Sequence, residues 1–218
     1  EEELELQYLT SASLEALSPY LSDEGSKDLV FHRFKTGWST EGLHQANTLC
    51  ELGLERAWGG SGECIRLSAA GSRAVREYHP FAALEDTKNN IIWGVYLAHN
   101  TSWQIELSRW WNGVSLSAGI ADVINGMWTK KVKKGETFKS PTAMIGVAVG
   151  SIAELSNRII DMRHRAIDAY GEDGMGIAYN EFAYSWGKPT EPELLKAADI
   201  LKNGKTKYFV MDAGWFYR

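Results

Sequence analysis

Up to about residue 165, the chain alternates between apolar and polar positions, as half-buried strands do. The first such segment is ELELQYL, and DLVFHRFKTGW, IIWGVYLAH, SWQIELSRWW and AMIGVAVG follow it. Glycine, asparagine and proline separate these segments, and no regular helical spacing occurs before about position 151. The pattern predicts a largely antiparallel β-sandwich.

The hydrophobic period changes after residue 150. Ser151 to Tyr170 has apolar residues at helical spacing, and Ser151 with Glu154 forms a capping-box pattern. The glycine-rich stretch 171–174 precedes an apolar strand from Met175 to Tyr179. A second capped helix follows in PTEPELLKAADILKNG, and the strand KYFVMD comes after it. Strand, helix and strand within about 40 residues predict a parallel pair. We therefore expect two domains, 1–165 and 166–218.

Composition and charge limit the classes of partner. Of the 218 residues, 44% are hydrophobic and 23% are charged, which suits a globular chain with a real core. The net charge is −5, and the largest basic patch runs from Lys130 to Lys134. This patch could touch phosphate, but a solvated hairpin tip is favoured, so we expect no nucleic-acid partner. No apolar run is long enough to span a membrane.

Three further features bear on compartment and cofactors. Cys50 and Cys64 are expected to be packed thiols rather than a disulfide. The chain begins with Glu1 rather than Met, so we expect that this is not the native start. No signal-peptide pattern is visible, which favours the cytoplasm without deciding it. The five histidines lack zinc-ligand spacing and the glycines lack a phosphate-binding fingerprint, so no metal or cofactor is predicted.

Polar and aromatic residues follow the two C-terminal strands. Asp212 and Trp215 come after the last strand, and Tyr179 and Asn180 end the strand before the helix. In parallel α/β folds these strand ends form one rim, where functional groups gather. A carboxylate and an amide can bind adjacent hydroxyls while an indole covers the apolar face of a sugar ring.

A purely structural interpretation of the same residues stays open. Asp212 could cap a turn, Trp215 could cover the end of the sheet, and Tyr179 could pack in the rim. Glu181 could pair with a lysine instead of acting as an acid or base. The 9 Trp, 9 Tyr and 7 Phe are typical of sugar-binding proteins, but sandwich cores also use such residues.

The C-terminal segment IAYNEFAYSWGKPTEPELLKAADILKNGKTKYFVMDAGWFYR resembles the opening of the catalytic barrel of glycoside hydrolase family 36, the α-galactosidases and their relatives. FHRFKTGWSTEG, EYHPFAALED, the IIWGVYLAHNTSWQIELS hairpin and the passage ending GETFKSPTAMIGVAVGS are similar to the family's N-terminal β-supersandwich. The resemblance implies an antiparallel β-supersandwich, partial in this chain, over 1–165. The start of a (β/α)8 barrel would then occupy 166–218.

The resemblance also implies roles for single residues. Asp212 would bind sugar hydroxyls in the −1 subsite, while Trp215, Asn180 and Tyr179 would shape the pocket. Two positions depart from the family pattern. Ala213 stands where many α-galactosidases have a second aspartate, and Phe182 stands where tryptophan is commoner, so another α-linked sugar or N-acetylgalactosamine is possible.

Retaining glycosidases need a nucleophile and an acid/base about 5–5.5 Å apart. In the family these come from later barrel strands, so no catalytic residue is assigned in this chain. We expect a fragment of a retaining α-glycosidase that is inactive alone and whose parent acts on an α-galactoside or a related oligosaccharide. The parent could form a homo-oligomer, as members of that family often do. A non-catalytic carbohydrate-binding sandwich and a related transglycosylase are the alternatives.

Overall fold

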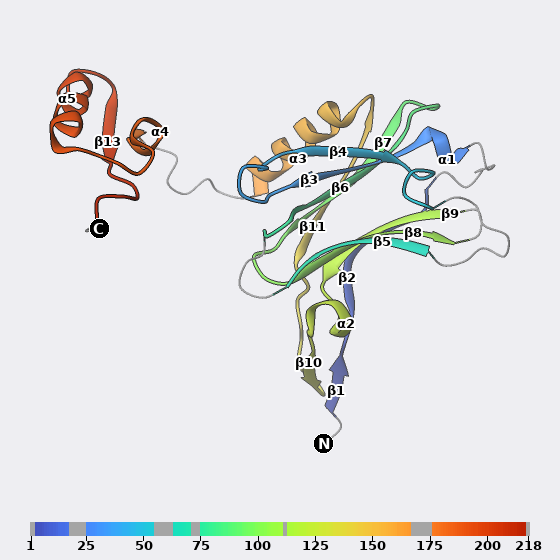
Figure 1. Ribbon diagram of the computed structural model, residues 1–218. Coiled ribbons are helices and arrows are strands. Elements are labelled where there is room, and N and C mark those ends of the chain that lie inside the picture. Colours follow the sequence, from blue (N-terminus) through green and yellow to red (C-terminus); the bar gives the residue numbers. More distant parts are fainter. Residues whose placement is uncertain are drawn as a thin grey trace. The chain divides into compact units, whose positions relative to one another are not determined.

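The computed structural model describes residues 3–17, 25–54, 63–70, 75–110, 113–166 and 176–216. The chain divides into two compact units, Glu1–Ala166 and Ile167–Arg218. The first is an antiparallel β-sandwich with one long helix, and the second is a small parallel α/β unit (Figure 1). This confirms the predicted fold class of an antiparallel sandwich followed by an α/β segment.

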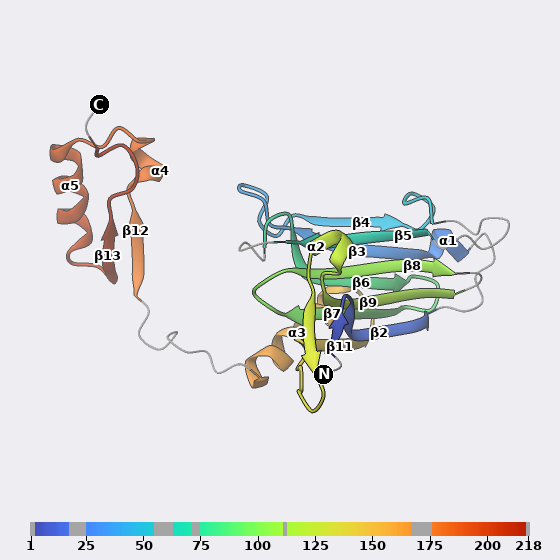
Figure 2. The ribbon, with the colours of Figure 1, turned by 90° about the horizontal axis from the view of Figure 1, so that it is seen from below.

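Two sheets build the sandwich. The five-stranded sheet contains, in spatial order, β11 (Thr142–Val149), β7 (Ile91–Ala98), β6 (Tyr78–Asp86), β3 (Leu29–Lys35) and β4 (His44–Thr48). The four-stranded sheet contains β2 (Leu9–Leu17), β9 (Gly113–Ile120), β8 (Trp103–Trp110) and β5 (Glu63–Ala69). Strands of the two sheets lie over one another and run in similar directions (Figure 2). This is the aligned packing that sheet twist favours.

Alternation along the strands places the main core between the sheets. In β8, Trp103, Ile105 and Leu107 point inward and are fully buried, whereas Glu106 between them lies on the outer face. In β3, Leu29 and Phe31 do the same from the opposite sheet. The period of two that predicted strands therefore also decides which residues form the core.

Helix α3 (Ile152–Ala166) covers the outer face of the five-stranded sheet (Figure 1). Leu155 is fully buried there and lies over Gly94 of β7 and Gly146 of β11. A Cβ on Gly94 would lie 2.5 Å from Cδ2 of Leu155, and one on Gly146 would lie 2.7 Å from Cδ1. The two glycines thus form a notch that receives the leucine side chain.

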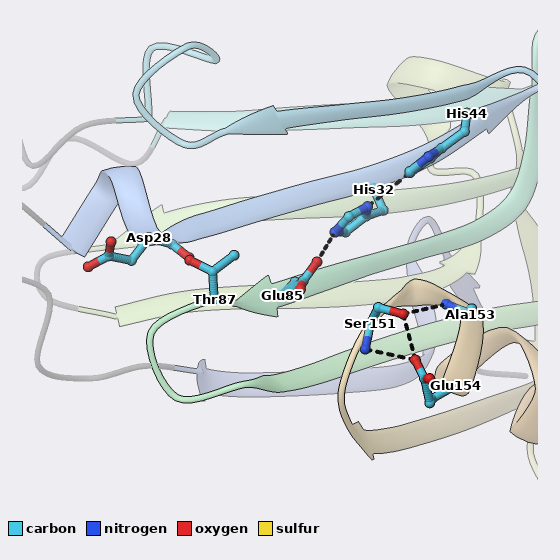
Figure 3. A network of polar contacts seen from close by, with 8 residues as sticks. All are labelled: Asp28, His32, His44, Glu85, Thr87, Ser151, Ala153 and Glu154. Atoms are coloured by element: carbon cyan, nitrogen blue, oxygen red, sulfur yellow. Dashed lines mark hydrogen bonds and ion pairs between the residues drawn. The ribbon is translucent and has the colours of Figure 1, made fainter.

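The start of α3 has the predicted capping box. The carboxylate of Glu154 accepts a hydrogen bond from the Ser151 backbone N–H at 2.9 Å, and the Ser151 hydroxyl accepts one from the Ala153 N–H at 3.3 Å (Figure 3). The predicted end of the helix at Tyr170 lies outside the described residues. The glycine-rich stretch 171–174 and the first residue of the next predicted strand, Met175, also lie outside them.

Small elements complete the sandwich unit. Strands β1 (Glu3–Leu6) and β10 (Lys130–Lys133) form a separate antiparallel ribbon that extends from it (Figure 1). The helical turns α1 (Gly25–Asp28) and α2 (Val123–Gly126) have four residues each, and no helical periodicity in the sequence predicted them.

Two lysines of the ribbon form ion pairs. Lys131 pairs with Glu3 at 3.2 Å, and Lys130 pairs with Glu136 at 3.1 Å. Acidic side chains therefore already accompany part of the basic patch.

The second unit is a strand, two helices and a strand. Its elements are β12 (Ile177–Asn180), α4 (Phe182–Ser185), α5 (Glu191–Leu201) and β13 (Thr206–Val210). β12 and β13 are hydrogen-bonded in parallel, as predicted. Thr190 is the N-cap residue of α5, but its hydroxyl bonds the Glu193 carboxylate at 2.6 Å and makes no cap bond to the backbone.

Two expectations concern cysteines and membranes. Cys50 and Cys64 are not joined by a disulfide. None of the helices in the described ranges is long and apolar enough to cross a membrane.

Candidate functional site: the C-terminal rim of the parallel strand pair

The register of the parallel pair brings two strand ends together. Tyr179 pairs with Phe209, and Asn180 pairs with Val210, after which both strands end. Because parallel strands point the same way, the residues following them emerge at one edge. Asn180 and Asp212 both lie at this edge although 32 positions separate them in the sequence.

Asn180 and Asp212 form a direct pair. The Asn180 side-chain Nδ2 donates a hydrogen bond of 2.7 Å to Oδ2 of Asp212. The Ala213 backbone N–H donates one of 2.7 Å to Oδ1 of the same carboxylate. The Asn180 amide, with a further contribution from the Ala213 N–H, holds the pKa of Asp212 below its ordinary value. The carboxylate is therefore ionised at neutral pH and can accept further hydrogen bonds from hydroxyl groups.

The two loops that follow the strands are tied to each other. The Phe182 N–H donates to Oδ1 of Asn180 at 2.9 Å, which fixes the orientation of the amide. Gly214, with φ of +101°, lies against Gly187, with φ of +74°, so closely that a Cβ on Gly214 would collide with the Gly187 backbone. Only glycine fits at Gly214, both for its φ and for this contact.

Trp215 and Tyr179 lie beside the pair rather than on it. Trp215 is 61% exposed and lines a cleft of about 530 Å³ between α5 and β13. That cleft is lined by Pro189, Glu191, Leu194, Leu195, Ala198, Phe209, Met211 and Trp215. The Tyr179 ring packs on the Phe209 ring with centroids 5.4 Å apart. Among the described residues, the geometry joins Asn180 to Asp212, whereas Tyr179 makes a packing contact.

The two departures from the family pattern have visible local consequences. Ala213 supplies a backbone N–H to Asp212 and no second carboxylate. The ring of Phe182 packs on the exposed Trp186, with centroids 6.0 Å apart. Trp186 follows α4 in a left-handed backbone conformation, with φ of 49°. Trp186 is therefore an exposed indole beside Phe182, and the sequence pattern did not single it out.

Glu181 is the rim residue whose burial and contacts the sequence did not predict. It is 2% exposed, and its Oε1 accepts a hydrogen bond from the Asp212 backbone N–H at 3.2 Å. The lysine partner considered for it is absent from the described residues, where its Oε2 has no hydrogen-bond partner. A carboxylate directly after a strand is the only sequence signal of this arrangement.

A second polar cluster lies in the sandwich unit, on the outer face of the five-stranded sheet. His32 is 4% exposed, and its Nε2 lies 2.8 Å from Oε2 of Glu85 while its Nδ1 lies 2.9 Å from Nε2 of His44 (Figure 3). Burial lowers the pKa of His32, and the Glu85 carboxylate offsets part of this shift. Neutral His32 donates to Glu85 and accepts from His44, so each ring nitrogen is satisfied. Within the described ranges no group of three or more histidine, cysteine or acidic residues could hold a metal ion.

Comparison with known proteins identifies solved structures with a similar fold. No protein-family model matches the sequence, and no curated protein matches it. Among solved structures, the fold is similar to that of the GH36 α-galactosidase AgaB from Geobacillus stearothermophilus, with a TM-score of 0.68 and 16% identity. It is similar to the galactosidase domain of the α-galactosidase-sucrose kinase AgaSK, with a TM-score of 0.69 and 14% identity.

Both matches cover 99% of this chain and 28% of the matched chain. The likeness therefore extends over both units, while the chain spans just over a quarter of the length of these proteins. It confirms the structural resemblance that the sequence motifs predicted. Because the sequence identities are only 14% and 16%, this likeness is one of fold alone.

Proposed function

We propose that this chain is part of a retaining α-glycosidase of the α-galactosidase type. The sandwich unit corresponds in this proposal to the N-terminal supersandwich, and the α/β unit to the first two strands of a (β/α)8 barrel. Asp212 and Asn180 bind adjacent hydroxyls of the terminal sugar, and Trp215 and Tyr179 shape the pocket. The nucleophile and the acid/base then belong to later strands of the parent enzyme.

The single observation that carries this proposal is the Asn180–Asp212 hydrogen bond at the carboxyl ends of adjacent parallel strands. An amide and an ionised carboxylate held 2.7 Å apart present a donor and acceptors at the spacing of vicinal hydroxyls. They lie at the edge where α/β barrels carry their active sites.

Exposure of the α/β unit supports its assignment to a larger barrel. In β13 and just after it, Tyr208, Phe209, Val210 and Met211 are 37–55% exposed. Parallel strands are normally buried on both faces, because helices cover one side and neighbouring strands or barrel residues the other. Apolar strands with this much exposed surface are what the first strands of an incomplete barrel present.

The proposal predicts sugar binding that depends on Asp212. Galactose titration of the chain, followed by NMR, is expected to shift the Asp212 and Asn180 signals, and Asp212→Asn is expected to abolish these shifts. Asp199→Asn is the matched control, because Asp199 is on the exposed surface of α5 and pairs with Lys202 at 2.7 Å. Equal galactose binding by the Asp212→Asn variant would contradict the assigned role.

Hydrolysis separates the enzyme from the binding-module alternative. The longer protein that contains this chain is expected to hydrolyse an aryl α-galactoside, and the 218-residue chain is expected not to do so. Turnover by the 218-residue chain at a rate near that of the longer protein would contradict the expectation that the catalytic carboxylates come from later strands.

A further inference from the structure

Glu181 is a buried carboxylate in a unit whose other described residues are half-buried or exposed. It is 2% exposed, whereas the neighbouring Tyr184 and Trp186 are 66% and 78% exposed. Its Oε2 is buried and has no hydrogen-bond partner among the described residues. Burying a carboxylate with one oxygen unpaired costs folding free energy, so such groups are uncommon in folded proteins.

The contacts of Glu181 extend the strand pairing beyond the end of β12. Its backbone N–H donates to the Val210 carbonyl at 3.2 Å, and its side-chain Oε1 accepts from the Asp212 N–H at 3.2 Å. Glu181 therefore forms hydrogen bonds with both chain neighbours of Met211, Val210 and Asp212. The side chain replaces the backbone carbonyl that would have continued the parallel ladder.

These contacts act on the candidate sugar-binding pair. Glu181 fixes the peptide nitrogen of Asp212, while its chain neighbour Asn180 bonds the Asp212 side chain. The Phe182 N–H in turn orients the Asn180 amide. Backbone and side chain of Asp212 are therefore held from two consecutive residues, which leaves little freedom for its carboxylate.

We propose that Glu181 is a positioning residue that fixes the Asp212 peptide and thereby holds the Asn180–Asp212 pair in its binding geometry. The carboxylate of Glu181 is closed off from solvent, which separates this role from that of an acid or base exchanging protons with a ligand. The link to sugar binding depends on the proposed function above, whereas the positioning of Asp212 does not.

The test compares two variants that keep the volume of the side chain. Glu181→Met removes the acceptor and keeps an unbranched chain in the buried site, while Glu181→Gln keeps an amide oxygen at the acceptor position. Exchange of the Asp212 amide hydrogen is expected to be about tenfold faster, or more, in the Met variant, as loss of one charge-assisted hydrogen bond predicts. In the Gln variant it is expected to stay near the original rate.

The pKa of Asp212, followed by the NMR titration of its carboxyl carbon, gives a readout with an informative sign. Removing a nearby negative charge alone lowers the pKa of Asp212, whereas loosening its contact with Asn180 raises it. We expect a rise in Glu181→Met. Glu193→Met, the charge-matched control on α5, is expected to leave this pKa unchanged. Unchanged amide exchange together with an unchanged or lowered pKa in Glu181→Met would overturn the inference.

Galactose titration of the same variants distinguishes the two proposals. If the original chain binds galactose and Glu181→Met binds it with at least about tenfold weaker affinity, both proposals are supported. If galactose does not bind the original chain while the amide and pKa changes occur, the positioning role stands and the sugar assignment fails. If galactose binding and the Asp212 amide are both unchanged in Glu181→Met, the sugar assignment stands and the positioning role fails.

Discussion

Gly214, which follows β13, packs against Gly187, which follows α4, with no room for a Cβ between their backbones. The contact joins the two loops that carry Asp212 and Trp186. In this contact Gly214 has a φ of +101°, a backbone conformation that residues with a Cβ rarely adopt. The rim of the candidate site therefore depends on a backbone contact as well as on side chains.

Replacing Gly214 with alanine is expected to destabilise this rim by roughly 1–3 kcal/mol, from the positive φ and the collision with Gly187. Hydrogen exchange of the Asp212 and Ala213 amides measures the effect locally. Gly204→Ala is the control in the same unit, since its Cβ would approach only Leu201 O, at 3.3 Å. Equal protection of the rim in Gly214→Ala and Gly204→Ala would show that the loop contact is dispensable.

Asn180→Ala is expected to raise the pKa of Asp212 toward its ordinary value, because the Asn180 amide is the main cause of the lowered pKa. A lowered carboxyl pKa contributes stability above the unfolded-state pKa, and this contribution is lost as pH falls through the folded-state pKa. The variant should therefore lose less stability than the original chain on acidification through that window. Carboxyl-carbon NMR titration measures the pKa, and Asn203→Ala is the exposed control.

The buried histidine gives the sandwich unit a pH dependence of its own. Because burial lowers the pKa of His32, the unfolded chain binds a proton more readily than the folded chain. Stability is expected to fall as pH decreases through the ordinary histidine value of about 6.5 toward the lower folded-state value. His79 and His99, whose pKa values burial also lowers, contribute in the same direction.

His32→Gln isolates the contribution of that residue. The variant is expected to be less stable at pH 7.5 and to show a shallower loss of unfolding free energy on acidification, measured by urea denaturation across this range. His164→Gln, on the exposed side of α3, serves as the control. A slope identical to that of the original chain would assign the pH dependence to other groups.

Leu155→Ala is expected to cost about 2–5 kcal/mol of unfolding free energy, as large-to-small changes at fully buried leucines do. Gly146→Ala is expected to destabilise the original chain by crowding Leu155 and Ile159, and to cost less in the Leu155→Ala background. Urea denaturation of the four chains in this double-mutant cycle measures the coupling. Strict additivity would mean that the leucine and the glycine notch do not depend on each other.

Much of the architecture was predictable from local patterns. Alternation along SWQIELSRWW places Trp103, Ile105 and Leu107 inward, and the capping box at Ser151 marks the start of α3. Parallel pairing of β12 and β13 follows from the helix between them, since only a crossover of that length lets two consecutive strands run the same way.

The details of the rim were less accessible. The sequence placed Asn180 and Asp212 at one edge, but the register that joins them depends on pairing between distant segments. Glu181 is polar and lies next to a turn, so local rules place it in solvent, and only the Val210 and Asp212 contacts explain its burial. No sequence pattern predicted the position of Trp186, because its left-handed backbone and exposed ring depend on how α4 ends.

The fit of Leu155 into Gly94 and Gly146 has a consequence for how the chain can be divided. The helix fills a depression in the outer face of the sheet, so it completes the sandwich instead of merely leading away from it. A chain truncated before Ser151 would expose Ala83, Ile92 and Ala148 to solvent. Such an apolar patch favours association with other molecules. A truncated chain meant to contain only the first unit should therefore end after α3, so that the helix still covers the sheet.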